Sequence, residues 1–264
     1  MALGVIPLAI GIIGNVLSVL AFCSTIPTFW RIVKKKSVEN FSDHPYIFSL
    51  LSALLWGFYG LLTLKNGGLM LVVINGIGCI FQYAYLALYV AFSPPHKQMV
   101  TGAFVAGVHL SVMAIVVMVK FFLKEENVRL RVMGICSSMA AIAMFGSPLS
   151  IMGLVICTKS VEYMPFLLSL AFALRTGIWC AYSYAIHDIY LEVTNTIGTA
   201  LGLVQLILYM IYHRKPPRKA CEKDVRLQEA QSGHIDGDQG GSIHISTDNC
   251  GVGENIGDKT ETKV

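Results

Sequence analysis

Two stretches of the chain, residues 36–62 and 159–185, repeat one another at a distance of 123 residues. The matching pairs are Lys36-Ser37-Val38-Glu39 with Lys159-Ser160-Val161-Glu162, Trp56 with Trp179, and Tyr59 with Tyr182. Both copies lie between apolar segments that are long enough to cross a bilayer, so the repeat predicts a duplicated membrane unit. Duplicated membrane units are typical of transporters.

The composition also places the chain in a membrane. Of its 264 residues, 55% are hydrophobic and 14% are charged, and the mean hydropathy is +0.62. A soluble domain of this size must keep more polar groups on its surface. The formal charge of +4 lies in the loops and the tail, which indicates contact with anionic membrane lipid and not with nucleic acid.

Seven apolar segments have the length of roughly 20 residues that a helix needs to cross about 30 Å of hydrocarbon. They lie near 3–29, 45–64, 69–92, 99–119, 132–156, 166–186 and 190–212. A backbone exposed to lipid must form its hydrogen bonds within its own segment, so all seven are predicted to be helices. The predicted fold class is all-α integral membrane, with two parallel three-helix bundles joined by an inversion helix (3+1+3).

This reading divides the chain into four regions. They are a first three-helix repeat (1–95), a linker helix with an outer loop (96–125), a second three-helix repeat (126–213) and a cytoplasmic tail (214–264). The tail contains no aromatic residue and is rich in small and charged residues, so we expect it to be disordered.

Lys and Arg set the expected orientation. With the N-terminus outside, the inner loops hold six positive charges and the tail near the last span holds six more, against five in the outer loops. Positive charges favour the cytoplasmic side, so we expect the N-terminus outside and the C-terminus in the cytoplasm. The plasma membrane is the expected location of this multi-pass chain.

Spaced motifs in both halves resemble the SWEET sugar facilitators of plants (MtN3/saliva type). In the first half these are Ile26-Pro27-Thr28-Phe29, residues 35–41, Pro45-Tyr46 and Trp56-Gly57-Phe58-Tyr59. In the second half they are Ser147-Pro148-Leu149-Ser150, residues 158–165, Trp179 and Asp188-Ile189-Tyr190. The resemblance covers residues 4 to about 212 and leaves out the tail.

The resemblance implies one sugar site near the middle of the membrane, between the two bundles. In it, Asn75 and Asn195 would hydrogen-bond the sugar hydroxyls, Trp56 and Trp179 would stack on the sugar faces, and Ser18, Ser52 and Met144 would complete the wall. Pro27, Pro45, Pro148 and Pro165 match the family's cytoplasmic proline tetrad, and Tyr59, Lys65 and Asp188 match its outer gate. The expected partners are a small sugar, membrane lipid and further copies of the chain in a homo-oligomer.

The chemistry of a sugar supports these residue types independently. A polyol presents donors and acceptors around its edge and C–H groups on its faces, which suits amides and flat aromatic rings. Each residue type also has a structural alternative: Asn bridges membrane helices, Trp anchors at the headgroup level, and Pro kinks a helix without acting as a hinge. For Asp188 the alternative is a solvated loop carboxylate.

Arg175 is the only formal charge deep inside a predicted span, at a position where the family pattern has a small uncharged residue. Four residues before Trp179, it is predicted to lie over the indole ring and to donate to sugar hydroxyls. It would then restrict the substrate to a monosaccharide. The alternative is that Arg175 snorkels to water along the cavity wall. The resemblance also implies that sucrose-transporting members have Val at the place of Met144. Met144 is bulkier than Val, which favours a smaller pocket and a hexose.

The predicted mechanism is passive, bidirectional uniport by alternating access, without a cofactor. We expect no carboxylate within the spans. His109, in the linker helix, is then the only candidate proton carrier that the spans contain. There is no Gly-rich phosphate loop, and no paired acids, Ser/His pair or His-Glu-x-x-His helix suggests an enzyme. A sucrose transporter of the same family and a seven-helix receptor remain the alternatives, although Asp-Arg-Tyr and Asn-Pro-x-x-Tyr motifs are absent.

Overall fold

The computed structural model describes residues 4–38, 41–161 and 164–213, so the predicted tail lies outside the described residues. The first repeat contains α1 (Val5–Cys23), α2 (Ile26–Lys35), α3 (His44–Leu62), the 3-10 turn η1 (Leu64–Asn66) and α4 (Leu69–Phe92). The linker is α5 (Pro95–Val117), continued by the π-helical turn η2 (Met118–Phe122). The second repeat contains α6 (Glu126–Met144), α7 (Gly146–Thr158), α8 (Phe166–Ile186) and α9 (Ile189–Tyr212).

Seven helical stretches of the described chain are long and apolar enough to cross a membrane, which confirms the predicted all-α fold. The first span reaches Lys35 and the fifth covers Glu126–Thr158, so both are longer than predicted, and each consists of two helices. The breaks come just before Pro27 and Pro148, since proline lacks an N–H and its ring clashes with the preceding turn. The fourth span is also longer and covers Pro95–Phe122.

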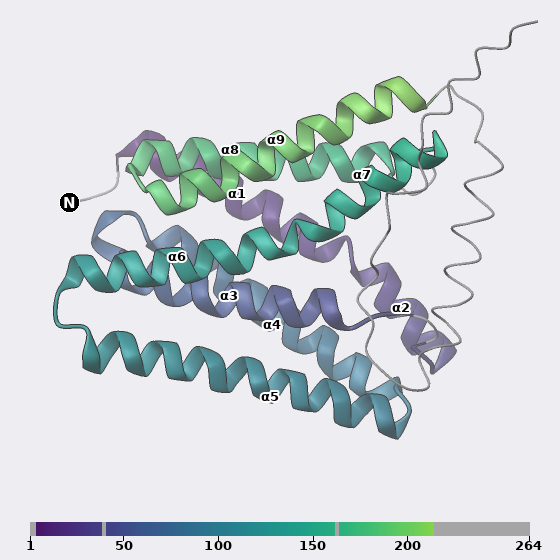
Figure 1. The fold of residues 1–264 in the computed structure, drawn as a ribbon, viewed down its shortest axis with the longest axis horizontal. Helices are drawn as coiled ribbons and strands as arrows, with labels where there is room; N and C mark the ends of the chain where they lie inside the picture. The colour runs from purple at the N-terminus through teal and green to yellow at the C-terminus, as the bar shows by residue number, and fades with distance from the viewer. Residues whose placement is uncertain (1–3, 39–40, 162–163, 214–264) are drawn as a thin grey trace, which may run out of the picture.

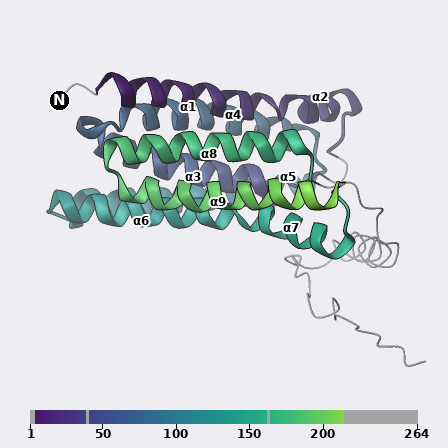
Figure 2. The ribbon, with the colours of Figure 1, turned by 90° about the horizontal axis from the view of Figure 1, so that it is seen from above.

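Six helices form a closed ring in which each packs against two neighbours, in the order α1, α4, α3, α6, α9 and α8. The helices run side by side (Figures 1 and 2). The linker helix α5 lies at the edge of the molecule in Figure 1, against α3 and α4. Two of the ring contacts, α1 with α8 and α3 with α6, join the first repeat to the second. The centre of the ring therefore lies between the repeats, as the 3+1+3 arrangement predicts.

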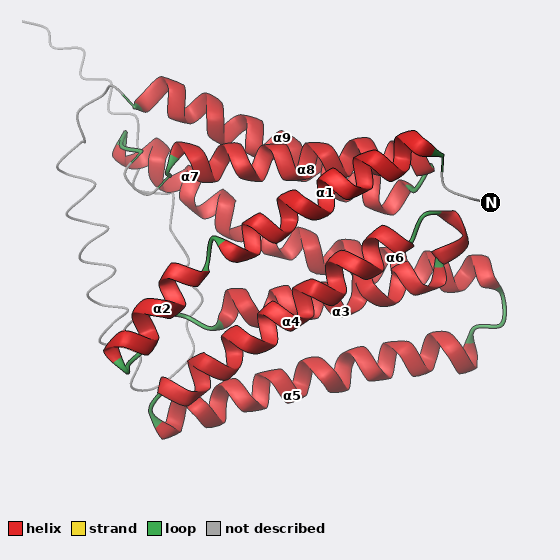
Figure 3. Ribbon diagram, turned by 180° about the vertical axis from the view of Figure 1, so that it is seen from behind, coloured by secondary structure: helices red, strands yellow, loops and turns green. Residues whose placement is uncertain are grey.

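The two repeats make matching contacts. Asn15 on α1 donates to the backbone oxygen of Met70 at 3.3 Å, and Ser138 on α6 donates to that of Tyr190, also at 3.3 Å. The first residues of these pairs are 123 positions apart, but the second are 120 apart. The offset falls by three because η1 lengthens the α3–α4 connection, whereas α8 and α9 are separated by two residues. Figure 3 shows the two connections at the end of the molecule that carries the N-terminus.

The repeated Lys-Ser-Val-Glu motif ends a helix in both copies. Lys36 follows α2 and Lys159 follows α7, with φ of 52° and 56° in the left-handed region. A left-handed residue after a helix lets the next N–H groups bond to the last carbonyls of that helix. The motif is thus a chain-reversal signal on the side of the molecule away from the N-terminus.

One detail of the charge prediction is wrong. Glu192 lies within the predicted span 190–212, and the structure places it in the first turn of α9. A carboxylate is favoured there because the first turn of a helix carries a partial positive charge. The carboxylate therefore lies at the end of the span and not at mid-membrane.

Candidate functional site

Two tyrosines join the repeats reciprocally at the end that carries the N-terminus. Tyr59 on α3 donates to a carboxylate oxygen of Asp188, between α8 and α9, at 2.8 Å. Tyr182 on α8 donates to the backbone oxygen of Gly67, between α3 and α4, at 2.6 Å. We call these two hydrogen bonds the tyrosine latch. Each bond ties a core helix of one repeat to the helix connection of the other, so the latch closes this end of the ring.

The two tryptophans lie directly beneath the latch. Trp56 meets the edge of Tyr59 with ring centroids 5.4 Å apart and an interplanar angle of 89°. Trp179 meets Tyr182 in the same way, at 5.4 Å and 82°. All four rings belong to one buried cluster, and only 6% of Trp56 and 7% of Trp179 is exposed. Edge-to-face pairs prefer one relative orientation, so a latch tyrosine that moves is expected to change the position of the tryptophan packed against it.

A cavity of about 450 Å³ lies beside the latch, at the end of the molecule that carries the N-terminus. Tyr59, Lys65 and Asp188 all line it, so the structure brings the three predicted gate residues together. Lys65 is exposed on η1 and forms no ion pair with Asp188. The latch is therefore a tyrosine–carboxylate contact, and the lysine stands at the mouth of the cavity.

Asp188 is buried in a way that raises its pKa. Burial is the largest influence and raises the pKa, while hydrogen bonds from Tyr59 and from the backbone N–H groups of Leu191 and Tyr190 act in the opposite direction. The two backbone bonds are both 3.1 Å long and make Asp188 the N-cap of α9. Asp188 is thus a structural cap and a latch partner at once.

The raised pKa predicts a dependence on external pH. In the latched state Asp188 binds a proton more readily than a solvated carboxylate, so protonation favours that state. This added stability is fully present below the ordinary Asp pKa of 3.8 and is lost as pH rises through the raised pKa. We expect uptake to fall when the outside is acidified into this window. Uptake into vesicles at external pH 4 and pH 7 measures it, and Asp188→Asn should show no such fall.

Asn75 and Asn195 lie at equivalent places on α4 and α9. Each side-chain N–H donates at 2.9 Å to the carbonyl four residues earlier, that of Leu71 or Leu191. Among the described residues no further hydrogen bond is made by either amide, so each keeps an oxygen and a second N–H for another partner. Asn75 lies next to Gly57, the neighbour of Trp56: a Cβ added at Gly57 would be 3.6 Å from the Cβ of Asn75.

The remaining predicted wall residues differ in their hydrogen bonds and in their place on the helices. Ser18 is buried and already has two hydrogen-bond partners, Gly14 and Trp179. Ser52 is buried on α3 and makes no hydrogen bond within the described part of the chain. Met144 is the last residue of α6, immediately before the break that starts α7. A change in that break would therefore move Met144 directly.

The prediction that Arg175 lies over Trp179 is wrong. Its guanidinium lies 5.9 Å from the ring centroid of Phe172, three residues earlier on α8. Long side chains on a helix point back toward its N-terminus, which explains why Arg175 reaches residue 172 and not residue 179. Arg175 is half-buried and has no hydrogen bond or ion pair within residues 4–38, 41–161 and 164–213. Phe172 in turn meets the edge of Phe145, which lies at the α6–α7 break.

The four predicted prolines lie toward the other end of the molecule, at helix starts. Pro27 and Pro45 lie in the first turns of α2 and α3, Pro148 lies in that of α7, and Pro165 is the N-cap of α8. The residue that caps α3, in the place that Pro165 holds on α8, is Asp43. Proline fits these places because the first N–H groups of a helix have no partner within it.

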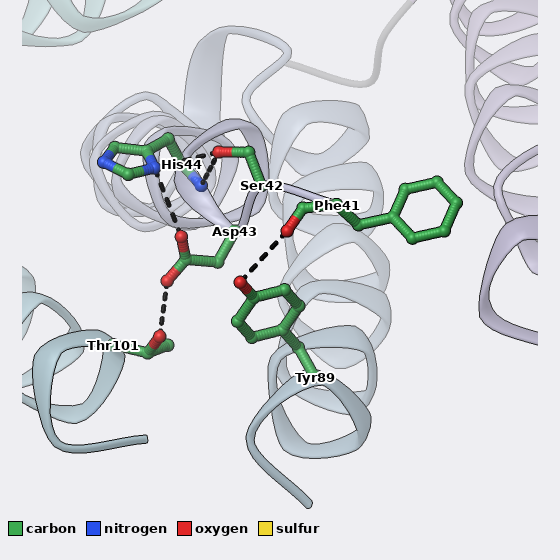
Figure 4. Close-up of polar contacts among 6 residues, drawn as sticks. All are labelled: Phe41, Ser42, Asp43, His44, Tyr89 and Thr101. Atoms are coloured by element: carbon green, nitrogen blue, oxygen red, sulfur yellow. Dashed lines mark hydrogen bonds and ion pairs between the residues drawn. The ribbon is translucent and has the colours of Figure 1, made fainter. Parts of the chain in front are cut away.

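A buried acid fastens this end of the first repeat to the linker helix (Figure 4). Only 6% of Asp43 is exposed, and its carboxylate accepts a hydrogen bond from the Thr101 hydroxyl on α5 at 2.5 Å. Its other oxygen lies 3.2 Å from Nδ1 of His44. The Tyr89 hydroxyl donates to the carbonyl of Phe41 at 3.1 Å. The start of α3 is thus held to both α4 and α5.

Neither Tyr182 nor Asp43 was predicted from the sequence to be a gate residue, and both make the contacts described above at the two ends of the molecule. Tyr182 was visible as the repeat of Tyr59, and the 123-residue offset would have marked it as a second latch residue. Asp43 gave no comparable signal, because its partner Thr101 is 58 residues away on the linker helix, which has no counterpart in the repeat.

Comparisons with known proteins identify relatives of the chain. The family described as "Sugar efflux transporter for intercellular exchange" matches residues 8–97 and 131–217. The bidirectional sugar transporter SWEET8 of Arabidopsis thaliana is 39% identical over 226 residues, which make up 84% of this chain and 93% of that protein. SWEET15 of Oryza sativa subsp. indica is 38% identical over 217 residues, 82% of this chain and 67% of that protein.

A solved structure has the same fold. It is described as the 3.7 Å resolution structure of a eukaryotic SWEET transporter and is 36% identical in sequence. The TM-score is 0.74, over 78% of this chain and 96% of the other. The chain spans about two thirds of the length of three rice relatives that it matches, with shares of 67%, 64% and 68%.

Proposed function

Because the chain belongs to the SWEET family of sugar transporters, we propose that it is a passive, bidirectional uniporter that moves a monosaccharide across a membrane by alternating access. The observation that carries this proposal is the central layer of the six-helix ring. Two buried tryptophans lie there under a latch that joins the repeats, and the ring helices α4 and α9 each carry an asparagine with unused hydrogen-bonding groups. Flat rings and amides suit the faces and edge of a sugar.

Alternating access follows from this layout. With the tyrosine latch closed, the site is shut off from the cavity on the outer side. The breaks before Pro27 and Pro148 supply the few residues that a hinge needs at the other end. Opening one end while the other closes would expose Trp56, Trp179, Asn75 and Asn195 to each side in turn.

The position of His109 supports transport without proton coupling. His109 is exposed on α5, outside the ring of six helices. Its Nε2 lies 2.6 Å from the Tyr83 hydroxyl and its Nδ1 lies 2.7 Å from the carbonyl of Val105. Both ring nitrogens are therefore occupied, one by Tyr83 on α4 and the other by the carbonyl of Val105 on the same helix, and His109 has no place on the sugar path.

Uptake of labelled sugar into vesicles that hold the purified chain tests this function. We expect glucose to equilibrate across the membrane without accumulating, and a protonophore to leave the rate unchanged. Glucose, fructose, galactose and sucrose compared side by side identify the substrate. Accumulation above the outside concentration that a protonophore abolishes would show a coupled transporter, and absence of uptake of every sugar would reject the proposal.

The size limit on the substrate is assigned to Arg175 and Met144. Arg175 lies one helical turn before Trp179 on α8 and has unused donors, and Met144 ends α6 next to Phe145, whose ring meets that of Phe172. Arg175→Ser is expected to enlarge this region and to raise the ratio of sucrose to glucose uptake. The ratio is measured in one vesicle preparation with both labels. An unchanged ratio with normal glucose uptake would mean that Arg175 only snorkels toward water.

The same proposal includes location and assembly. The distribution of Lys and Arg favours a plasma-membrane protein with its N-terminus outside, and the tyrosine latch then faces outward. A homo-oligomer is proposed as its assembly. The seven-helix receptor is not favoured, because the matching contacts of the two repeats give the chain the internal symmetry of a transporter.

A further inference from the structure

The hydroxyl of Ser18 bridges the two repeats. It donates to the carbonyl of Gly14 at 2.8 Å and accepts the indole N–H of Trp179 at 3.0 Å. The two partners in the second bond lie on α1 and α8 and are 161 residues apart in sequence. Only 2% of Ser18 is exposed. Its proton and one of its lone pairs are therefore occupied by the protein.

The surface of α1 around Ser18 is shaped to receive the aromatic rings of α8. A Cβ added at Gly14 would lie 3.2 Å from Cε2 of Trp179, and one added at Gly11 would lie 2.8 Å from a ring carbon of Tyr182. Glycine at both positions lets the rings reach the α1 backbone. With the ring packed against α1 at Gly14, the hydrogen bond that the indole N–H donates to Ser18 restrains rotation about the two side-chain torsions of Trp179.

The other repeat lacks this arrangement. The 123-residue offset places Ala141 at the position equivalent to Ser18 and Ser137 at that equivalent to Gly14. Alanine has no hydroxyl to accept the indole N–H of Trp56. In the part of the chain that the structure describes, that N–H makes no hydrogen bond, whereas the N–H of Trp179 does. The two tryptophans match in sequence but are held differently.

We propose that Ser18 is a positioning residue that fixes Trp179 as a rigid wall of the sugar site, while Trp56 keeps a free N–H to donate to the sugar. Ser18 then acts through Trp179 and does not contact the sugar. This inference rests on the proposed function. It assigns unequal roles to the two repeats: one tryptophan is fixed before the ligand arrives, and the other adjusts to it. A fixed ring lowers the entropy lost on binding.

The test uses the full chain labelled with ¹⁵N at its three tryptophan side chains, Trp30, Trp56 and Trp179. In a two-dimensional spectrum each gives one indole N–H signal, assigned by single Trp→Phe variants. Ser18→Ala should move the Trp179 signal and speed its exchange with D₂O, and should leave Trp30 unchanged. Added glucose should shift the Trp56 signal of the wild-type chain more than the Trp179 signal.

Transport supplies the second readout. Losing the bond should raise KM for glucose by about three- to tenfold, the range expected for one neutral hydrogen bond, with kcat changed less than twofold. Ser111→Ala is the matched control, because Ser111 on α5 is exposed and bonds only to the carbonyl of Val108 on its own helix. It should change neither the Trp179 signal nor KM.

Four results separate the possible failures. A raised KM with an unchanged Trp179 signal would mean that Ser18 contacts the sugar itself, which overturns the proposal. A moved Trp179 signal with an unchanged KM would mean that the ring does not need fixing, which also overturns it. If the wild-type chain takes up no sugar, the proposed function fails, and an unmoved Trp179 signal in Ser18→Ala would separately reject the positioning bond.

Discussion

Replacing Asn75 or Asn195 by alanine is expected to abolish sugar uptake while the chain still inserts into the membrane. Each amide keeps an oxygen and an N–H that no described residue uses, and a sugar hydroxyl left without its partner costs about 1 to 3 kcal/mol. That loss corresponds to roughly five- to 150-fold in affinity for each variant. Initial rates of glucose uptake over a range of concentrations measure the effect.

The helices themselves should tolerate these changes. In both cases the lost intramolecular bond runs to a carbonyl of the same helix, which keeps its backbone partner. Asn127→Ala is a suitable control, since Asn127 is exposed in the first turns of α6 at the outer side. Near-normal uptake by a correctly inserted Asn75→Ala or Asn195→Ala chain would contradict the site assignment.

Tyr59→Phe is expected to open the outer side and to slow uptake about tenfold or more. The variant removes the hydroxyl that donates to the Asp188 carboxylate and leaves the ring that packs on Trp56. A hydrogen bond to a charged group contributes about 1.5 to 3 kcal/mol, so its loss shifts the ratio of latched to open molecules by roughly ten- to 150-fold. A carrier held open on one side cannot complete its cycle.

Spin labels report the opening directly. With labels at Asn66→Cys on η1 and Ile189→Cys at the start of α9, the distance between the repeats at the outer end should lengthen in Tyr59→Phe. Tyr182→Phe should give a smaller change, because its acceptor is the neutral carbonyl of Gly67. Tyr184→Phe, an exposed tyrosine on α8, is the control. An unchanged distance in Tyr59→Phe would show that this bond does not hold the latch.

Much of the fold was predictable because it depends on local properties of the sequence. Span number follows from the length of apolar segments, and the pairing of Trp56 with Trp179 follows from a constant offset. The two breaks in the long spans follow from single prolines, Pro27 and Pro148, whose effect on a helix acts within one turn. The lengths of the first and fifth spans were less predictable, because α2 continues past the apolar stretch and α6 begins before it, at Glu126.

The candidate site was predictable as a set of residues but not as a set of contacts. By itself the sequence determined the spans, the repeat and the residue types at the centre, since these are properties of position along one chain. Only the tertiary structure decided that Ser18 binds Trp179, that Asp43 binds Thr101, and that Arg175 turns toward Phe172. The first two contacts join helices distant in sequence, and the third depends on side-chain direction. Spacing along the chain specifies neither how a ring of helices closes nor which hydroxyl it brings to which partner.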